Sequence, residues 1–270
     1  MLRIVGRRAD GYHLLQTVFQ FLDRGDWLRF EPNDRGRIER KTDVAGVAPE
    51  ADLTVRAARL LQRATGSGSG ASIAIAKKLP MGGGLGGGSS DAATTLVALN
   101  HYWQTGLNED ALAELGLRLG ADVPVFVRGR AAWAEGVGER LTAVELDEPW
   151  FLVLTPACQV ATGAIFADPQ LTRNSPPIKI LDFLKGAGGN DCEPVVFRRY
   201  PEVAAAAAWL SRHGPARLTG TGACVFAAFP DEADARRVLR QLPPDWSGFV
   251  ARGRNRSPLQ ERLLRARSVR

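Results

Sequence analysis

The sequence predicts an α+β protein of two domains, and three observations lead to this prediction. Short apolar strands alternate with helical patterns, but without the regular strand–helix–strand repeat of a doubly wound parallel sheet. The pattern breaks at the acidic segment 147–149, after which a new apolar strand begins at Trp150. A chain of 270 residues, 45% hydrophobic and 24% charged, is long and apolar enough for two folded domains. We therefore expect domains over residues 1–147 and 148–270.

The expected elements of the first domain follow from hydrophobic spacing and turn residues. Alternation with period two predicts strands, and apolar residues three and four apart predict helices. Gly25-Asp26 predicts a turn, the glycines of 66–70 end a helix, and Asn108 is a helix N-cap. The expected elements are strands at 17–22, 27–30 and 73–75, and helices that begin near 53, 91 and 109.

The second domain is expected to mix strands and helices in a similar way. The tail 252–270 is rich in arginine and is expected to be a solvated surface or a frayed end. The expected elements are strands at 150–154, 217–218, 224–229 and 249–251, and helices at 162–166, 181–185, 202–211 and 231–239.

Composition excludes several classes of protein. No apolar run reaches the roughly 18–20 residues that span a bilayer, and the arginine-rich start 1–10 lacks the apolar core of a secretory signal. We therefore expect a cytoplasmic protein that does not contact a membrane. The net charge of +6 comes mainly from scattered arginines, which disfavours a nucleic-acid partner. A small-molecule substrate is expected, and the chain is expected to be a monomer or a homodimer.

The three cysteines do not suggest a metal site or a disulfide framework. Cys158, Cys192 and Cys224 are widely spaced, odd in number, and not grouped with any of the three histidines. We interpret them as small buried apolar residues and expect no protein-bound metal.

A glycine-rich segment lies between a predicted strand and a predicted helix. Residues 80–91 read PMGGGLGGGSSD. Glycine lets the backbone adopt positive φ and approach a ligand closely. Ser89, Ser90 and Asp91 stand at the expected helix start, where free N–H groups and the helix dipole favour an anion. The segment therefore predicts a phosphate-binding loop rather than a flexible linker, because linkers seldom run straight into an amphipathic helix.

Two common phosphate-binding motifs are excluded. The sequence has no GxxxxGK[ST], so the segment is not a P-loop. Gly82, Gly84 and Gly87 match the dinucleotide fingerprint formally. That fold needs a second strand with an acidic residue about 20 positions later, where this chain has only the connection 102–107. Binding of NAD is disfavoured, and an ATP-dependent kinase of a small hydroxylated metabolite is the favoured function.

Three further patterns allow two interpretations each. Asp122 could accept a hydroxyl proton during phosphoryl transfer, or could be a turn or cap residue. The second glycine loop, 219–224, could be a tight hairpin turn, or could pack against the first loop and complete a phosphate site. Tyr12 could stack on a nucleobase whose edge His13 contacts, or the two could be an ordinary core aromatic and a surface histidine.

Four sequence blocks together resemble the GHMP kinases. GRRADGYH at 6–13, LPMGGGLGGGSS at 79–90, GADVPVF at 120–126 and LTGTGACVF at 218–226 occur in this order. They are similar to the branch of the family that acts in non-mevalonate isoprenoid biosynthesis, and the likeness extends from about Gly6 to Pro258. The resemblance implies an N-terminal ATP-binding domain with a mixed sheet and a C-terminal α/β sandwich domain. The implied reaction is phosphorylation of the 2-hydroxyl of 4-diphosphocytidyl-2-C-methyl-D-erythritol by ATP with Mg²⁺.

The resemblance also implies roles for individual residues. Asp122 matches the catalytic aspartate, and Lys77 matches a residue near the adenosine. Tyr12 and Phe166 match an aromatic pair around cytosine, and His13 matches the residue that contacts the edge of the base. Residues Thr162, Gly220, Thr221 and Gly222 match positions near the substrate and its phosphates. The residues that match the ATP loop are Pro80, Met81, Gly82, Gly83, Gly84, Leu85, Gly86, Gly87, Gly88, Ser89 and Ser90.

The sequence departs from the family pattern at two places. The family's first strand carries a Pro-Ala-Lys-x-Asn segment, whereas residues 1–6 match only the end of that strand, and no lysine stands at the matching position. Loss of one such charge typically costs about 10²–10³ in rate. The expected fold therefore has a truncated first strand, through a start placed too late or in a shortened enzyme. In addition, Ala51-Asp52-Leu53 replaces the Asp-Asn-Leu that the family has near the adenine.

Two other functions remain open at this stage. One is a GHMP kinase for another small alcohol, which would not need an aromatic clamp for a base. The other is a nucleotide-binding protein of weak or no activity, which the missing lysine suggests.

Overall fold

The chain folds into two compact units that are interleaved along the sequence. A computed structural model describes residues 1–268. The first unit consists of Met1–Arg24, Pro80–Leu85 and Ala131–Asn255. The second unit consists of Gly25–Leu79, Gly86–Arg130 and the segment that begins at Arg256. These units are not two consecutive segments, so their borders do not coincide with residue 147. The division into domains 1–147 and 148–270 stays a prediction.

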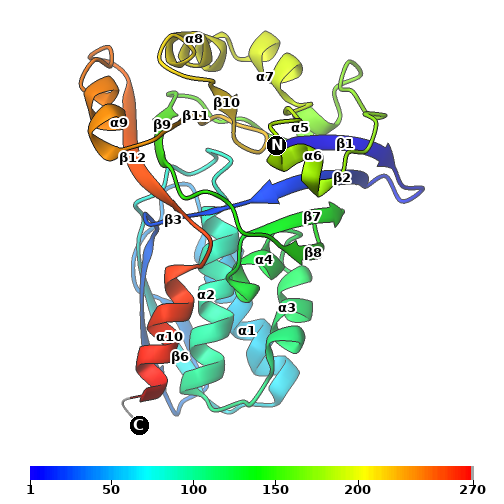
Figure 1. The fold of residues 1–270 in the computed structure, drawn as a ribbon. Coiled ribbons are helices and arrows are strands. Elements are labelled where there is room, and N and C mark those ends of the chain that lie inside the picture. The colour runs from blue at the N-terminus through cyan, green and yellow to red at the C-terminus, as the bar shows by residue number, and fades with distance from the viewer. Residues whose placement is uncertain (269–270) are drawn as a thin grey trace. The chain divides into compact units, whose positions relative to one another are not determined.

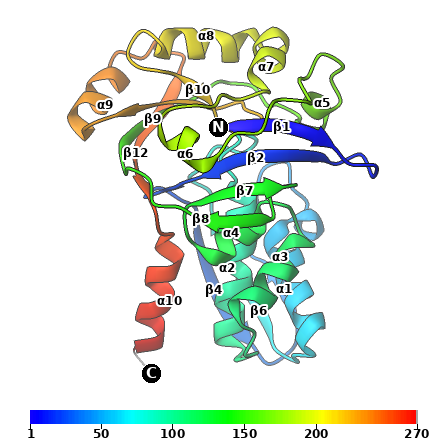
Figure 2. The ribbon, with the colours of Figure 1, turned by 45° about the vertical axis from the view of Figure 1, so that its right-hand side comes forward.

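The first unit contains two antiparallel sheets. One has the strand order β1-β2-β7-β8, which is easily followed in Figure 2, and the other has the order β10-β11-β9-β12-β3. Helices α8 and α9 pack on strands of the second sheet (Figure 1). The strands are β1 (Leu2–Arg7), β2 (His13–Phe19), β3 (Phe21–Leu22), β7 (Ala132–Gly136), β8 (Arg140–Ala143), β9 (Trp150–Thr155), β10 (Arg217–Leu218), β11 (Val225–Phe229) and β12 (Ser247–Arg254). The helices are α5 (Thr162–Phe166), α6 (Ile180–Leu184), α7 (Glu193–Arg199), α8 (Pro201–Leu210) and α9 (Glu232–Leu239).

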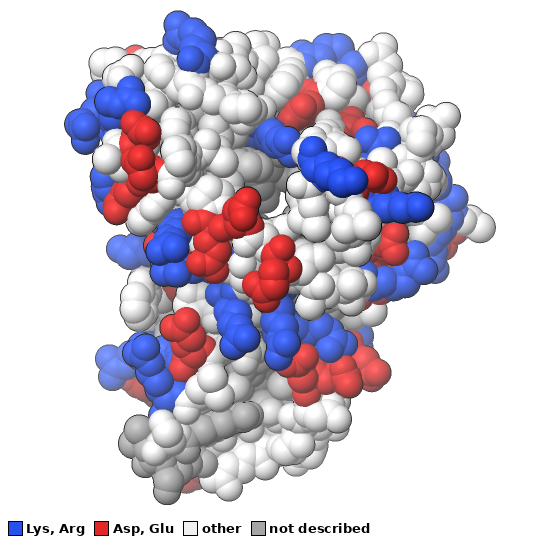
Figure 3. All heavy atoms as spheres, in the orientation of Figure 1, with Lys and Arg blue, Asp and Glu red and all other residues white. Residues whose placement is uncertain are grey.

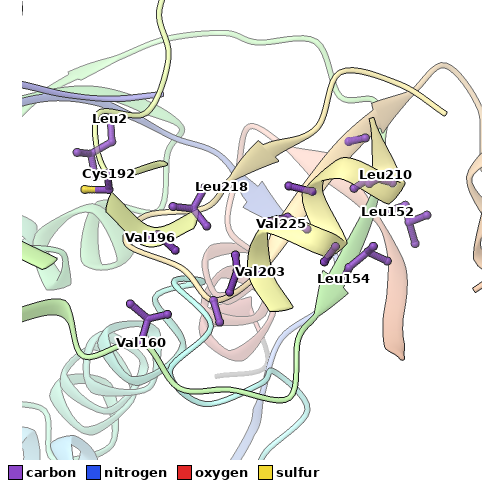
Figure 4. Close-up of a cluster of buried hydrophobic side chains, with 14 of the residues drawn as sticks. Leu2, Leu152, Leu154, Val160, Cys192, Val196, Val203, Leu210, Leu218 and Val225 are labelled. Carbon is purple, nitrogen blue, oxygen red and sulfur yellow. The ribbon is translucent and has the colours of Figure 1, made fainter. Parts of the chain in front are cut away.

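The core of the first unit lies between the five-stranded sheet and its helices. Alternate residues of β9 and β11 point into it, because successive side chains of a strand face opposite sides of the sheet. Leu152, Leu154 and Val225 from the strands meet Val203 and Leu210 from α8 (Figure 4). Each of these five side chains is at most 1% exposed. This packing fixes the positions of the loops at the ends of the strands.

The second unit is a mixed three-stranded sheet with helices packed against it and one another. The strand order is β4-β6-β5, with β4 antiparallel and β5 parallel to β6. Helix α2 contacts α1, α3 and α4 (Figure 1). The elements are β4 (Trp27–Asn33), β5 (Ile38–Arg40), the 3₁₀ turn η1 (Pro49–Ala51), α1 (Leu53–Thr65), β6 (Gly70–Ala76), α2 (Gly87–Tyr102), α3 (Glu109–Leu117), α4 (Val123–Arg128) and α10 (Pro258–Ser268).

Helix ends in the second unit are set by local sequence signals. The carboxylate of Asp52 accepts a hydrogen bond of 2.8 Å from the Thr54 N–H and so caps α1. The same side chain forms a buried ion pair of 2.7 Å with Arg40. Gly66 ends α1 at φ 65°, and Asn108 caps α3 through the Ala111 N–H, as the sequence predicted. Asp52, the departure from the family's Asp-Asn-Leu, therefore has a structural role.

The strands on either side of Gly25-Asp26 belong to different units: β3 pairs with β12 in the first unit and β4 pairs with β6 in the second. For the tail the sequence offered a solvated surface or a frayed end, and the frayed end is wrong: β12 extends to Arg254, and α10 packs Leu259 and Leu263 on the core of the second unit. The last part of the predicted tail, residues 269–270, lies outside the described residues.

One face of the molecule carries charged side chains of both signs. On the face drawn in Figure 3, the Lys and Arg side chains are intermixed with Asp and Glu. Among the described residues, no helix combines the length and the apolar character that crossing a membrane requires.

Candidate active site

The first half of the glycine-rich segment, Pro80–Leu85, belongs to the first unit and packs against the second glycine loop. Backbone N–H groups of Ala223 and Cys224 donate to the carbonyl groups of Gly82 and Gly83, at 3.2 and 3.1 Å. The hydroxyl of Thr219 donates to the Gly84 carbonyl at 2.8 Å. The interpretation that 219–224 packs against the first loop is therefore confirmed.

Glycine is required where the two loops meet. A Cβ atom on Gly84 would lie 2.2 Å from the Thr219 carbonyl oxygen, and φ at Gly84 is +73°. A Cβ atom on Gly83 would lie 2.6 Å from the Cys224 sulfur. Both distances are well below van der Waals contact, so only glycine allows this approach of the two backbones.

The second half of the segment, 86–90, belongs to the second unit and begins helix α2. Gly86 is the N-cap at φ +68°, and the Ser90 N–H donates to its carbonyl at 2.8 Å. The preceding amides at the start of a helix have no intrahelical acceptor. Such amides, together with the helix dipole, make a helix start suited to a phosphate group. This half of the loop therefore has the geometry that the sequence predicted.

A buried cluster of three charged residues supports the start of α2. The Lys77 ammonium group contacts the carboxylates of Asp26 and Asp91, the latter at 2.8 Å. Asp26 also accepts hydrogen bonds from the Lys78 and Leu79 N–H groups, which lead into the glycine loop. Lys77, which the resemblance places near the adenosine, is thus ion-paired within the second unit.

The cluster shifts the ionisation of its members. Burial raises the pKa of Asp91 to about 6, because its ion pair with Lys77 offsets only part of the lost hydration. Burial lowers the pKa of Lys77, but the hydrogen bonds and charges of Asp26 and Asp91 outweigh it, so the net change is upward. The lysine therefore remains charged at neutral pH.

Asp122 lies in the second unit at the start of α4, but it does not cap that helix with its side chain. Burial raises the pKa of its carboxyl group. Its carboxylate has no hydrogen bond or ion pair to any of residues 1–268. Helix α4 packs on α2, and Phe126 of α4 lies against Gly86. An unpaired carboxylate whose pKa is raised is suited to accept a proton.

Residues of the predicted base-binding site lie together in the first unit. His13 begins β2, and its ring stacks on that of Phe166, at the end of α5, with centroids 5.0 Å apart. Tyr12 precedes His13, and 64% of its surface is exposed. The guanidinium Nε–H of Arg173 donates to His13 Nε2 at 3.1 Å. His13 therefore contacts both Phe166 and Arg173, whereas Tyr12 is largely exposed to solvent.

The second glycine loop is fixed by three further hydrogen bonds. The hydroxyls of Thr162 and Thr221 form a hydrogen bond of 2.8 Å. The side-chain amide of Asn190 donates to the carbonyls of Leu218 and Gly220, at 3.0 and 2.7 Å. The predicted residues Thr162, Gly220, Thr221 and Gly222 therefore belong to one local structure.

Sequence reasoning missed Asp26, Asn190 and Arg173. Asp26 appeared only as part of a turn, and Asn190 and Arg173 belong to no recognised motif. Each acts through contacts between residues far apart in the chain: Asp26 and Lys77 are 51 positions apart, and His13 and Arg173 are 160 apart. No local signal in the sequence identifies them.

Comparisons with known proteins identify the family of this chain. Residues 52–130 match the GHMP kinases N terminal domain, and residues 176–247 match the GHMP kinases C terminal domain. A protein of Ectopseudomonas mendocina called 4-diphosphocytidyl-2-C-methyl-D-erythritol kinase is 60% identical, over 97% of this chain and 90% of its own length. The chain belongs to the GHMP kinase family.

Other GHMP kinases agree with this assignment. A protein of Halorhodospira halophila with the same name is 58% identical over 98% of this chain and 93% of its own. A crystal structure of 4-(cytidine 5'-diphospho)-2C-methyl-D-erythritol kinase has a TM-score of 0.81 and 31% identity, over 93% of this chain and 94% of its own. The mevalonate kinase of Methanococcus jannaschii, with a TM-score of 0.67 and 14% identity over 92% of this chain and all of its own, shares the fold. GHMP kinases use ATP as the phosphate donor.

Proposed function

We propose that this GHMP kinase transfers the γ-phosphate of ATP to the 2-hydroxyl of 4-diphosphocytidyl-2-C-methyl-D-erythritol, in non-mevalonate isoprenoid biosynthesis. The observation that carries the proposal is about 60% identity along nearly the whole chain to a kinase of that name. The His13–Phe166 pair supports it, because a stacked histidine and phenylalanine suit a substrate with a nucleobase. A substrate without a nucleobase would not need this aromatic pair.

The proposed mechanism depends on positioning and on charge. The amides of the glycine-rich loop bind the ATP phosphates, and the Asp122 carboxylate takes the proton of the 2-hydroxyl as it attacks the γ-phosphorus atom. The loss of hydration that raises the pKa of Asp122 makes it a better proton acceptor than an exposed aspartate. Phosphoryl transfer needs little covalent chemistry from the protein, so alignment of the hydroxyl and the phosphate accounts for most of the rate.

The proposed metal ion is Mg²⁺ bound with ATP. Such an ion takes most of its ligands from phosphate oxygens and water, and needs one or two oxygens from the protein. Residues 1–268 contain no cluster of three or more His, Cys, Asp or Glu side chains for a metal. The hydroxyl of Ser90, in the first turn of α2, would supply such an oxygen. When bound, Mg²⁺ offsets the charge of the transferring group. The predictions of a cytoplasmic location and of a monomer or homodimer stay predictions.

The test is a coupled assay of ADP release with the purified chain. We expect turnover with the cytidyl substrate and Mg-ATP, and little with mevalonate or homoserine as acceptors. Asp122→Asn should lower kcat by about 10² or more and leave both KM values within a few fold, because it removes the proton acceptor but little volume. Asp110→Asn, an exposed aspartate paired with Arg128, is the matched control. Faster turnover of another alcohol would reject the substrate, and an unchanged kcat in Asp122→Asn would reject the role of Asp122.

A further inference from the structure

Arg173 is held rigidly beside His13 by the backbone of the loop that follows α5. Its guanidinium group donates to the carbonyl oxygens of Phe166 and Asp168 at 2.8 and 2.7 Å, and to that of Leu171 at 3.0 Å. A further donor of the same group, Nε–H, points at His13 Nε2 at 3.1 Å. A guanidinium group carries five N–H donors and accepts no hydrogen bond. The arginine is therefore fixed as a donor toward the imidazole.

This contact determines which nitrogen of His13 carries a proton. A nitrogen that accepts a hydrogen bond cannot itself bear hydrogen, so Nε2 is unprotonated and the proton of the neutral ring lies on Nδ1. Nδ1 forms no hydrogen bond with any of residues 1–268. Stacking on Phe166 fixes the plane of the ring. His13 therefore offers one N–H donor in a fixed plane and no acceptor at that position.

The charges around His13 support the same state. Burial lowers its pKa, and the guanidinium groups of Arg173 and of Arg7 on β1 lower it further. These two cations are the charged groups that face the ring, and Phe166 on the other side is neutral. The imidazole consequently stays neutral at physiological pH.

We propose that Arg173 is a specificity-determining positioning residue, which fixes His13 as an Nδ1–H donor and thereby selects cytosine over uracil. This inference rests on the proposed function. N3 of cytosine is an acceptor and pairs with the Nδ1–H group, whereas N3 of uracil bears hydrogen and opposes it. A buried donor that meets a second donor loses its hydrogen bond, and a site built for a hydrogen bond rejects the mismatched ligand strongly.

The decisive variant removes the guanidinium group. In Arg173→Met, His13 is free to move its proton to Nε2, and Nδ1 then accepts a hydrogen bond from N3–H of uracil. We expect the wild-type chain to prefer the cytidyl substrate over its uridyl analogue by about 10²-fold or more in kcat/KM, and the variant by about tenfold or less. The change should lie in KM of the base-bearing substrate, with KM for ATP unchanged.

A matched control separates this effect from disorder of the loop. Arg198 contacts the same loop through the carboxylate of Asp168, at 2.9 and 3.0 Å, but not His13. Arg198→Met should therefore keep the full preference for cytosine. An equal loss of preference in both variants would overturn the inference.

The dependence on pH gives a readout that a merely structural role would not change. Burial and Arg7 still lower the pKa of His13 in Arg173→Met, so both ring nitrogens carry hydrogen only well below the ordinary histidine pKa of about 6.5, at about pH 5 or lower. Nδ1 is then a donor again, so the preference for cytosine should return at that pH and vanish near pH 8. In the wild type the preference for cytosine should be the same at both pH values. A preference in the variant that is equally low at both pH values would contradict the inference.

A measurement without substitution at Arg173 tests the tautomer directly. Nitrogen-15 NMR distinguishes protonated from unprotonated imidazole nitrogens, and His13→Gln identifies the signals of His13 among the three histidines. We expect hydrogen on Nδ1 of the free protein at about pH 7, and hydrogen on Nε2 would refute the inference. This result is independent of activity. Turnover of neither pyrimidine substrate would reject the proposed function and leave the tautomer measurement standing.

Discussion

Asp91 is a buried carboxylate in the first turns of α2, close to the glycine-rich loop. Its pKa is raised from about 3.8 to about 6, so the folded protein holds this proton more tightly than the unfolded chain does. Through this group, the folded state is stabilised below about pH 4, and that contribution is lost as the pH rises through about 6. The ionised form of the buried Asp91 therefore lowers the free energy of unfolding at neutral pH. The same carboxylate contacts Lys77 beside the start of α2.

We expect Asp91→Asn to change the pH dependence of stability. An amide at this position cannot titrate, so between about pH 4.5 and about pH 7 the wild type should lose up to about 2 kcal/mol relative to the variant. Urea unfolding at the two pH values measures the difference. Asp110→Asn, which changes an exposed aspartate, should leave the pH dependence unaltered. A difference between wild type and Asp91→Asn that does not vary with pH would contradict the raised pKa.

Residues of the site differ in how far the sequence reveals them. The place of the glycine loop between a strand and a helix could be predicted, because the glycines follow β6 and lead into α2 directly along the chain. Arg173 could not, since its role arises only when the loop after α5 is placed beside β2. The same holds for Asp26, which is joined to Lys77 by the pairing of β4 with β6.

The close contact of the two glycine loops is an element-scale feature that can be tested by substitution. Gly84→Ala would place a methyl group 2.2 Å from the Thr219 carbonyl oxygen at a positive φ, which costs about 1–2 kcal/mol before any clash is counted. The loop must shift, so we expect KM for ATP to rise about tenfold or more, with a smaller change in KM for the cytidyl substrate. Steady-state kinetics with each substrate varied in turn measures both.

Gly68→Ala is the matched control for this prediction. Nothing lies within 4 Å of the Cβ that it would add, so both KM values should stay within about twofold of the wild type. An unchanged KM for ATP in Gly84→Ala would show that the contact of the two loops does not position the nucleotide.

Elements with strong local signals were predicted well, and elements defined by distant partners were not. The caps of two helices, Asn108 at the start of α3 and Gly66 at the end of α1, can be identified directly in the sequence. The strands on either side of the turn at Gly25-Asp26 instead pair with distant segments, β3 with β12 and β4 with β6. Local spacing indicates that two segments are strands, but it carries no information about the partners with which they pair.

At the scale of the whole molecule, α10 shows that the C-terminal segment belongs to the second unit. Leu259 and Leu263 pack on its core, and the Gln260 side chain donates to the Val127 carbonyl at 3.0 Å. This segment is rich in arginine, so its composition alone does not indicate that two of its leucines pack on a core. The sequence offered a solvated surface or a frayed end, and the structure shows an amphipathic helix with two leucines on the core and exposed residues beside them.

We expect the double substitution Leu259→Ala and Leu263→Ala to lower the free energy of unfolding by about 2–4 kcal/mol, because two partly buried side chains lose their packing. Leu264→Ala, which changes a leucine of the same helix that is 64% exposed, should cost less than about 0.5 kcal/mol. Denaturant unfolding followed by far-UV circular dichroism measures both. Equal, small effects would mean that α10 does not contribute to the core of the second unit.

The interleaving of the two units constrains how genes of this kind can recombine. The chain passes from one unit to the other after residues 24, 79, 85, 130 and 255. A single crossover with a homologous gene, wherever it falls, leaves at least one unit assembled from two parents, and an intact exchange of a unit requires all five junctions. Chimaeras of these enzymes should therefore be assembled by unit, across several joints, rather than by halves of the coding sequence.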